Sequence, residues 1–228
     1  MGQVQDLIHA RGRVLSLHAF IQRLEGAASY SEFVSILPRL GFFVLAFQDM
    51  LRLSRAGCTD PELLVHVQGL ERGDRGHDAW YLEDLGSLGI NLDARNLFSA
   101  EYQVTRETTY ELMSMVLRAP DDYCRLTLLL SLEETAHEFF ERVSKYAKRA
   151  GVTATLRFFG GEHLIAEESH EVFEEGAQKV LKEMVIPVAA RGAVKGTVER
   201  TFHAMTRLAD DLVSAMMTVA SRPASGVS

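Results

Sequence analysis

Apolar side chains recur at helical spacing along almost the whole chain. In the first stretch, residues 3–24, they fall three or four positions apart, as on one face of an amphipathic helix. The run Leu40–Leu53 is apolar nearly all round, which predicts a helix buried among other helices. No segment suggests a sheet. The pattern therefore predicts an all-α protein.

Start and stop signals divide this pattern into about seven helices. Thr59 or Asp60 can cap a helix that has Pro61 in its first turn. We expect this helix to reach Leu88 and to end at Gly89. A preceding helix should end at Ser54 and carry Pro38 in its first full turn. The other helices are expected at 94–118, 122–149, 155–175 with a bend at Gly160-Gly161, and 190–221.

Length and composition favour one domain, residues 1–221, followed by a disordered tail, 222–228. The formal net charge of −7 argues against non-specific binding of nucleic acid, which needs a basic surface. No run of 18 apolar residues predicts a membrane span, and the N-terminus lacks the layout of a secretion signal. With only two cysteines, Cys58 and Cys124, expected to be reduced, we predict a cytoplasmic protein.

The segment from Gly161 to His170 contains the pattern H-x-x-x-E-x-x-H, formed by His163, Glu167 and His170. At about 100° per residue, Glu167 lies about 40° to one side of His163 and His170 about 20° to the other. The three side chains therefore share a narrow stripe, and imidazole with carboxylate suits iron, manganese or zinc. A solvent-exposed helix can also carry these residues by chance.

A second segment, Glu71–Tyr81, places Asp74 and His77 three positions apart, so that they share one face of a helix. Two glycines fall within the same turn. They permit close packing of helices, or they mark a bend beside a site. Taken alone, His77 is equally well explained as a hydrogen-bonded histidine of the core.

A third segment, Leu126–Phe140, offers two adjacent carboxylates, Glu133 and Glu134. The helical neighbours of Glu133 are mostly apolar, so Glu133 should face inward, whereas Glu134 lies towards the edge of the apolar stripe. A buried carboxylate must be paired, protonated or bound to a metal. The alternative to a metal is an ion pair with a buried arginine.

The order and spacing of the three segments together resemble those of the haem-oxygenase-like di-iron oxidases, relatives of haem oxygenase and of the TenA and PqqC proteins. The resemblance covers about Leu37 to Gly176, and the stretch Gly76–Gly89 resembles the surroundings of the first histidine in that family. It implies a single haem-oxygenase-like helical bundle. The metal ligands that it implies in this chain are Asp74, His77, Glu133, His163, Glu167 and His170.

The resemblance also implies an activity. Members of the family use iron and O2 to oxidise small molecules such as fatty acids and amino acids, so we expect two Fe(II) ions, O2 as co-substrate and a small-molecule substrate. The family usually supplies one more glutamate from the region Leu37–Asp49, where Asp49 is the nearest candidate here. Asp74 also stands where a glutamate is more usual. One of the two iron positions is therefore expected to be weak.

Two other functions stay open. One is a metal-free enzyme of the TenA or PqqC kind, in which Glu133 and the histidines bind an organic substrate and Cys124 is the candidate nucleophile. The other is a non-catalytic helical protein that binds a small molecule. The sequence leaves a homodimer open as well. Near the site, we expect Trp80, Tyr81 and Phe140 to line a cavity and His137 to orient Glu133.

Overall fold

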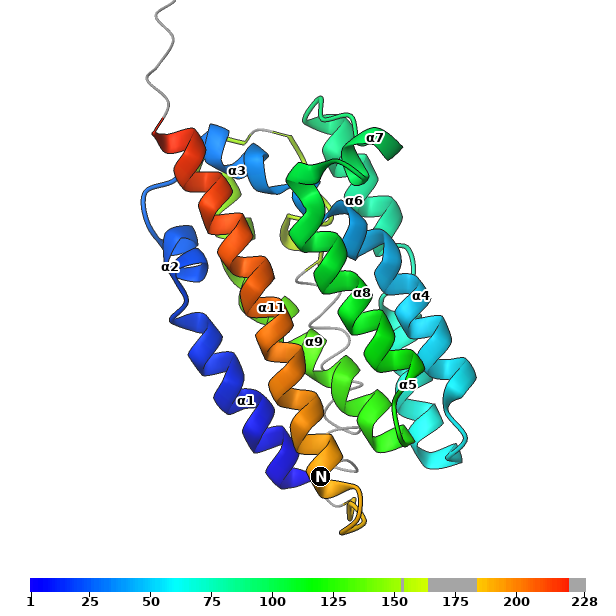
Figure 1. Cartoon of the computed structure of the whole chain (residues 1–228). Coiled ribbons are helices and arrows are strands. Elements are labelled where there is room, and N and C mark those ends of the chain that lie inside the picture. Colours follow the sequence, from blue (N-terminus) through cyan, green and yellow to red (C-terminus); the bar gives the residue numbers. More distant parts are fainter. Residues whose placement is uncertain (153, 164–183, 222–228) are drawn as a thin grey trace, which may run out of the picture.

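The computed structural model describes residues 1–152, 154–163 and 184–221, and all regular structure in these ranges is helical (Figure 1). This confirms the predicted all-α bundle. The elements are α1 (Gly2–Ser16), α2 (Ala19–Glu25), α3 (Tyr30–Ile36), the 3₁₀ turn η1 (Pro38–Leu40), α4 (Gly41–Gly57), α5 (Pro61–Gly73), α6 (His77–Ser87), α7 (Ala94–Leu97), the 3₁₀ turn η2 (Ala100–Tyr102), α8 (Gln103–Leu117), α9 (Asp122–Arg149) and α11 (Arg191–Ala220). The expected tail, 222–228, lies outside the described residues.

The two longest helices, α9 and α11, pack against each other and connect the rest of the bundle. Helix α11 also contacts α1, α2, α3 and α8, while α9 contacts α1, α2, α4 and α5 (Figure 1). Both helices have the bounds expected from the sequence to within one residue. The start of α9 is fixed by Asp121, whose side chain accepts a hydrogen bond from the Cys124 amide.

The described chain has more helices than the seven or so expected, because several expected helices are interrupted. Residues 3–24 form two helices, since His18 leaves the helical conformation and its ring accepts a hydrogen bond from the Phe20 amide. Pro38 begins the separate turn η1 instead of lying in the first turn of a long helix. The expected helix 94–118 is divided into α7, η2 and α8.

The expected single helix from Pro61 to Leu88 is wrong, because the chain bends between α5 and α6. Asp74 ends α5, and Gly76 adopts a φ of 92°, a backbone conformation that L side chains rarely adopt. His77 then begins α6. Of the two roles considered for Gly73 and Gly76, close packing of helices or a bend, the bend is therefore correct. Gly89 ends α6 as expected, with a φ of 71°.

The expected helix over 155–175 begins too early, because residues 154–160 form an irregular loop and the described helical residues begin at Gly161. The loop is held by Asp84 of α6, whose carboxylate accepts hydrogen bonds from the backbone N–H groups of Arg157 and Phe159. Its end is tight, since a Cβ atom at Gly160 would lie 1.9 Å from the carbonyl oxygen of Leu156. Tertiary contacts thus override the helical pattern. Residues 164–175 lie outside the described ranges.

The interior consists of two main apolar clusters, one towards each end of the bundle as drawn in Figure 1. The upper core cluster joins α2, α3, α6, loop 154–160 and the second halves of α9 and α11, and includes Phe33, Tyr81, Phe140, Tyr146 and Phe159. The lower core cluster joins α4, α5, α8 and the first halves of α9 and α11, and includes Met50, Val67, Leu112, Leu129 and Leu132. The bend between α5 and α6 falls between the two clusters, as does the middle of α9.

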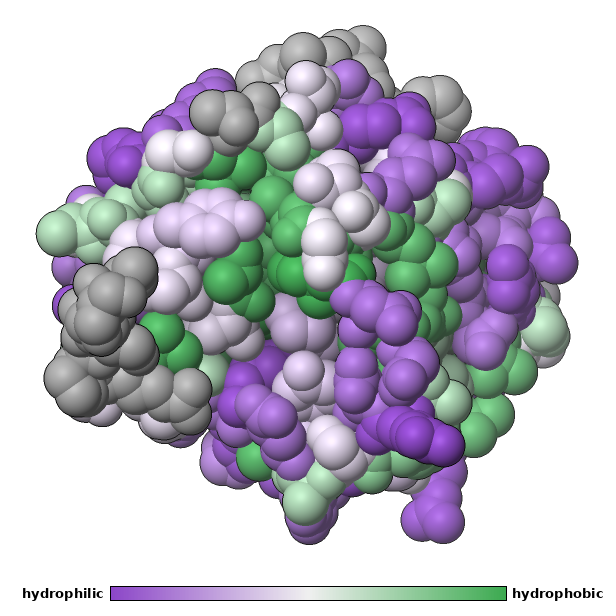
Figure 2. Space-filling model, turned by 90° about the horizontal axis from the view of Figure 1, so that it is seen from above, coloured by the Kyte–Doolittle hydropathy of each residue, from purple (hydrophilic) through white to green (hydrophobic). Residues whose placement is uncertain are grey.

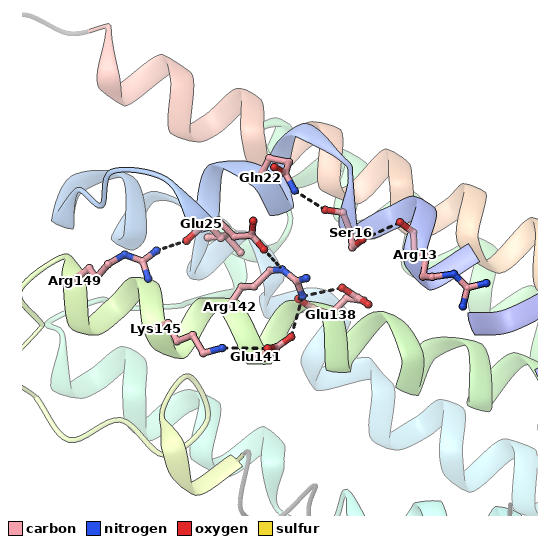
Figure 3. Close-up of polar contacts among 10 residues, drawn as sticks. Arg13, Ser16, Gln22, Glu25, Glu138, Glu141, Arg142, Lys145 and Arg149 are labelled. Atoms are coloured by element: carbon pink, nitrogen blue, oxygen red, sulfur yellow. Dashed lines mark hydrogen bonds and ion pairs between the residues drawn. The ribbon is translucent and has the colours of Figure 1, made fainter. Parts of the chain in front are cut away.

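A group of charged side chains fixes α2 to the second half of α9 (Figure 3). The Arg142 guanidinium lies 2.8 Å from carboxylate oxygens of Glu25 and Glu138 and 3.3 Å from one of Glu141. Arg149 donates to the backbone carbonyl of Leu24, the last-but-one residue of α2. These bonds hold the part of α9 that carries Phe140 in a defined position relative to α2.

The stretch Tyr30–Gly57, which joins α3, η1 and α4, is long and apolar enough to cross a membrane by length and composition alone, although the sequence led us to expect no such segment. In its most apolar window, 44% is buried inside the bundle, and core helices of globular proteins meet the same criterion. Seen from above, the bundle shows apolar surface in the middle of its upper end, with polar residues around it (Figure 2). The absence of a membrane span stays a prediction.

Candidate metal centre

Two buried histidines from distant parts of the chain meet inside the bundle. His77 is the first residue of α6, and His163 lies in the helical turn that follows loop 154–160. Their ring centroids are 4.4 Å apart with an angle of 39° between the planes. The two residues are only 4% and 3% exposed. The structure therefore brings these two predicted ligands together, and a third, Asp74, contacts His77.

Aromatic side chains surround this pair. Phe140 of α9 stacks on His163 with centroids 3.7 Å apart, and Phe158 meets His163 edge-on at 5.0 Å. Trp80 lies one turn after His77, with its ring 4.9 Å from the imidazole. Trp80 and Phe140 thus lie beside the histidines, as predicted for residues lining a site. Phe158 was not singled out from the sequence, because loop 154–160 was expected to be helical.

Tyr81, the third aromatic residue predicted to line a cavity, has a different position. Its hydroxyl donates a hydrogen bond to the backbone carbonyl of Leu37 at 2.8 Å, and its ring packs against Phe158 and Phe159. The residue is fully buried in the upper core cluster. Its contribution is to attach α6 to the end of α3 and to support Phe158.

Asp74 holds the ring of His77 from the bend between α5 and α6. Its Oδ1 atom lies 2.8 Å from His77 Nδ1, although Asp74 lies in the bend after α5 and His77 begins α6, so the two do not share a helical face as predicted. The Gln48 side-chain amide donates to Asp74 twice, to Oδ2 at 2.5 Å and to the backbone carbonyl at 2.8 Å. Asp74 is therefore positioned by α4 and in turn orients His77.

Gln48, and not Asp49, is the polar residue of α4 that reaches this site. Asp49 is 62% exposed at its side chain and pairs with Arg52 one turn later at 3.0 Å. Gln48 is buried. Asp49, the nearest candidate for the additional carboxylate expected from α4, is thus excluded by its direction. A sequence signal for Gln48 existed, since it is a rare polar residue in the apolar run Leu40–Leu53.

Glu133 lies on α9 between the two core clusters. It is half-buried, and because it precedes Phe140 by seven residues it shares the helical face that touches His163. Glu134 leaves the helix about 100° away. Its carboxylate reaches His9 of α1 at 2.9 Å, beside Gly12. Glu134 thus serves a contact with α1, whereas the inward direction of Glu133 stays a prediction.

Two supporting roles suggested by the sequence are not favoured by the structure. His137 is exposed, so it does not have the buried position expected of a residue that orients Glu133. Cys124, the candidate nucleophile of the metal-free alternative, is buried in the lower core cluster, and burial raises the pKa of its thiol to about 11. A thiol with such a pKa is protonated and weakly nucleophilic at neutral pH.

The side chains present can hold a first-row transition metal only with additional ligands. Among the described residues, no group of three or more His, Cys, Asp and Glu is arranged to hold a metal ion. Because Asp74 occupies Nδ1 of His77, a metal would bind this ring through Nε2, a pairing typical of metal-bound histidines. Glu133 is a predicted addition, because it shares the face of α9 that carries Phe140. The other two, Glu167 and His170, lie outside the described residues.

Comparisons with known proteins do not place the chain in a family. No protein-family model matches it, and a search of curated proteins found no similar sequence. The resemblance to the haem-oxygenase-like di-iron oxidases therefore rests on the residues quoted for it and on the all-α bundle, which many unrelated families share.

Proposed function

We propose that the protein is an iron-dependent oxidase or oxygenase that uses O2 to oxidise a small organic molecule. The observation that carries the proposal is the pair His77 and His163, two nearly fully buried imidazoles with centroids 4.4 Å apart. Imidazole is a preferred ligand of iron in proteins, and helical bundles build di-iron sites from histidines and carboxylates on facing helices. The predicted ligands Glu133, Glu167 and His170 would complete the set, although the last two lie outside the described residues.

Asp74 and Gln48 support this function by fixing the state of His77. A carboxylate at Nδ1 accepts the ring proton, which places the lone pair on Nε2. The Gln48 amide keeps the carboxylate in place by donating to it from α4. The chain thereby presents one imidazole with a defined tautomer and direction.

The aromatic residues beside the histidines would keep water from the reacting atoms. Trp80, Phe140 and Phe158 contact the two imidazoles, and all three contribute apolar surface. A dry, low-dielectric surrounding strengthens electrostatic interactions inside the site and protects reactive species from side reactions. When bound, iron would supply the binding and reduction of O2; the side chains supply orientation and exclusion of water.

The proposal is tested by metal content and oxygen consumption. Protein purified from iron-supplemented cells should contain iron by elemental analysis, and His77→Ala and His163→Ala should each lose most of it. The His66→Ala variant is the control, because His66 lies on α5 and is not one of the predicted ligands. Less than about 0.2 metal ions per chain after reconstitution with Fe(II) would contradict the proposal. If iron is bound, candidate small molecules are added one at a time, and the one that causes uptake of O2 identifies the substrate class.

A further inference from the structure

Asp84 of α6 binds the backbone of loop 154–160 with both carboxylate oxygens. Oδ1 accepts the N–H of Arg157 at 2.8 Å, and Oδ2 accepts the N–H of Phe159 at 2.9 Å. Asp84 is 2% exposed. Burial raises the pKa of Asp84 above its ordinary value, whereas the amide hydrogen bonds act in the opposite direction. A carboxylate this deeply buried needs such donors, so the loop and Asp84 stabilise each other.

The same loop residue connects Asp84 with the imidazole pair. The carbonyl oxygen of Arg157 accepts the backbone N–H of His163 at 3.2 Å, while the N–H of Arg157 donates to Asp84. Two consecutive hydrogen bonds through one residue therefore join Asp84 to His163. The position of the His163 backbone depends on α6 and not only on its own helix.

The Arg157 side chain reinforces this attachment from the outside. Its guanidinium lies over the Trp80 ring at 4.3 Å from the centroid and pairs with Glu83 at 3.1 Å and Glu162 at 2.9 Å. Trp80, Glu83 and Asp84 all belong to α6. The loop that leads to His163 is thus held to α6 by backbone and side-chain contacts together.

Helix α6 consequently carries both His77 and the residue that fixes His163. His77, Trp80 and Asp84 are spaced by three and four positions, so they share one face of the helix. We propose that Asp84 is a positioning residue, which sets the distance and direction of His163 relative to His77 through the backbone of Arg157. This inference rests on the proposed metal-binding function of the two histidines.

The test compares Asp84→Asn with Asp122→Asn, a matched control. Asn keeps the size of the side chain but replaces one acceptor oxygen by a donor, so one of the two amide bonds to the loop is lost. Asp122 is also a buried carboxylate that accepts backbone N–H groups, those of Thr59 and Asp60, but it lies beside the lower core cluster. Both variants should lose stability.

The two variants should differ in metal affinity. Metal-free protein is titrated with Co(II) and followed by visible absorption, below the unfolding transition of every variant. Asp84→Asn should raise the dissociation constant by about 10- to 100-fold, the usual effect of removing a residue that orients metal ligands, while Asp122→Asn should leave it unchanged. Equal weakening by both variants, or an unchanged affinity in Asp84→Asn, would overturn the inference.

A second measurement on metal-free protein separates this inference from the proposed function. Diethylpyrocarbonate modifies accessible imidazoles, and mass spectrometry of the peptide containing His163 gives its rate of modification. His163 should react faster in Asp84→Asn than in the wild type and at the wild-type rate in Asp122→Asn. No difference would overturn the positioning role. A wild-type protein that fails to bind Co(II) would instead contradict the proposed function and leave this measurement to decide the role of Asp84.

If Asp84→Asn does not fold, Asp84→Glu takes its place. It keeps both acceptor oxygens and the charge, but its side chain is one methylene longer and must displace the loop. The modification rate of His163 should then rise above that of the wild type. A rate equal to that of the wild type would overturn the inference.

Discussion

Gln48 and Asp74 meet where α4 passes the bend between α5 and α6, and the amide nitrogen of Gln48 donates to both the carboxylate and the backbone carbonyl of Asp74. One side chain thereby fixes a helix end and the carboxylate that orients His77. The same two bonds attach α4 to the bend that leads into α6.

Replacing Gln48 should therefore lower the free energy of unfolding more than replacing its neighbour Asp49. Gln48→Leu removes the donor from a largely buried carboxylate, which should lower the free energy of unfolding by about 1–3 kcal/mol. Asp49→Ala should change it by less than about 0.5 kcal/mol, because Asp49 is exposed and its pair with Arg52 is solvated. Urea denaturation of both variants gives the comparison. Equal losses would mean that the bonds to Asp74 contribute nothing measurable.

Glu133 and Glu134 are also adjacent residues that should differ, in this case in their effect on metal binding. Glu133→Ala should abolish binding of Fe(II), because it removes a predicted ligand on the helical face that touches His163. Glu134→Ala should retain the metal, since Glu134 pairs with His9 of α1. Its stability should fall by no more than about 1 kcal/mol, as expected for a partly exposed pair. The iron content of the two purified variants measures this difference. Equal loss of iron would refute the assignment of Glu133 to the site and of Glu134 to the contact with α1.

Titration of metal-free protein with Fe(II) under anaerobic conditions should show one tight and one loose binding step. The reason is that α4 supplies an amide, Gln48, and directs Asp49 to solvent, so this helix adds no carboxylate to the site. Carboxylates offset the charge of Fe(II), and a position with fewer of them binds more weakly. Two equally tight steps would reveal a ligand not yet identified.

Gly160 and Gly161 offer a test of the loop that leads to His163. Gly160→Ala would place a Cβ atom 1.9 Å from the Leu156 carbonyl oxygen, so the loop must shift, at a cost of about 1–3 kcal/mol. Gly161→Ala meets nothing within 4 Å and should be nearly neutral or slightly stabilising at the start of a helix. Thermal unfolding of the two variants measures the difference. A neutral Gly160→Ala would show that the loop is freer than its contacts suggest.

Asp122 should make stability sensitive to acid. Burial raises the pKa of this carboxyl, but hydrogen bonds from the backbone of Thr59 and Asp60 and from the Thr59 hydroxyl outweigh it, so the pKa is lowered from 3.8. A lowered pKa in the folded protein means that the stabilisation is present above about pH 3.8 and is lost as the pH falls further. Asp122→Asn should be less stable than the wild type at pH 7 and should lose less on acidification. The stability of both proteins is measured as a function of pH. If it fell in parallel in the wild type and in Asp122→Asn, this role of Asp122 would be contradicted.

The long helices were predictable because local and tertiary signals agree in them. Helix α9 has an uninterrupted apolar stripe, a capping residue at Asp121 and a glycine after its end, and it forms over the expected residues. The bend before His77 was not predictable with certainty, since apolar periodicity continues across it and only Gly73 and Gly76 signal a change. Periodicity alone does not reveal where a helix is broken by a left-handed residue.

Loop 154–160 could not have been predicted from its own sequence. Its apolar pattern resembles a helix, but Arg157 and Phe159 give their amides to Asp84, which lies 73 and 75 positions earlier in the chain. For the site, that His77 and His163 belong together was implied by the resemblance to the di-iron oxidases, and the structure places their rings side by side. The orientation of His77 by Gln48 and Asp74 was not implied by it, because it depends on how α4 crosses the bend.

Trp80 is the only tryptophan of the chain, and it contacts both the His77 ring and the Arg157 guanidinium. The protein therefore carries a single indole fluorophore, at the place where chemistry is proposed. Because indole emission responds to nearby charge, to quenching metal ions and to water, each of these changes would alter the signal of the unlabelled protein. Libraries of fatty acids, amino acids and related compounds can be screened optically for binding beside His77 before any reaction is known.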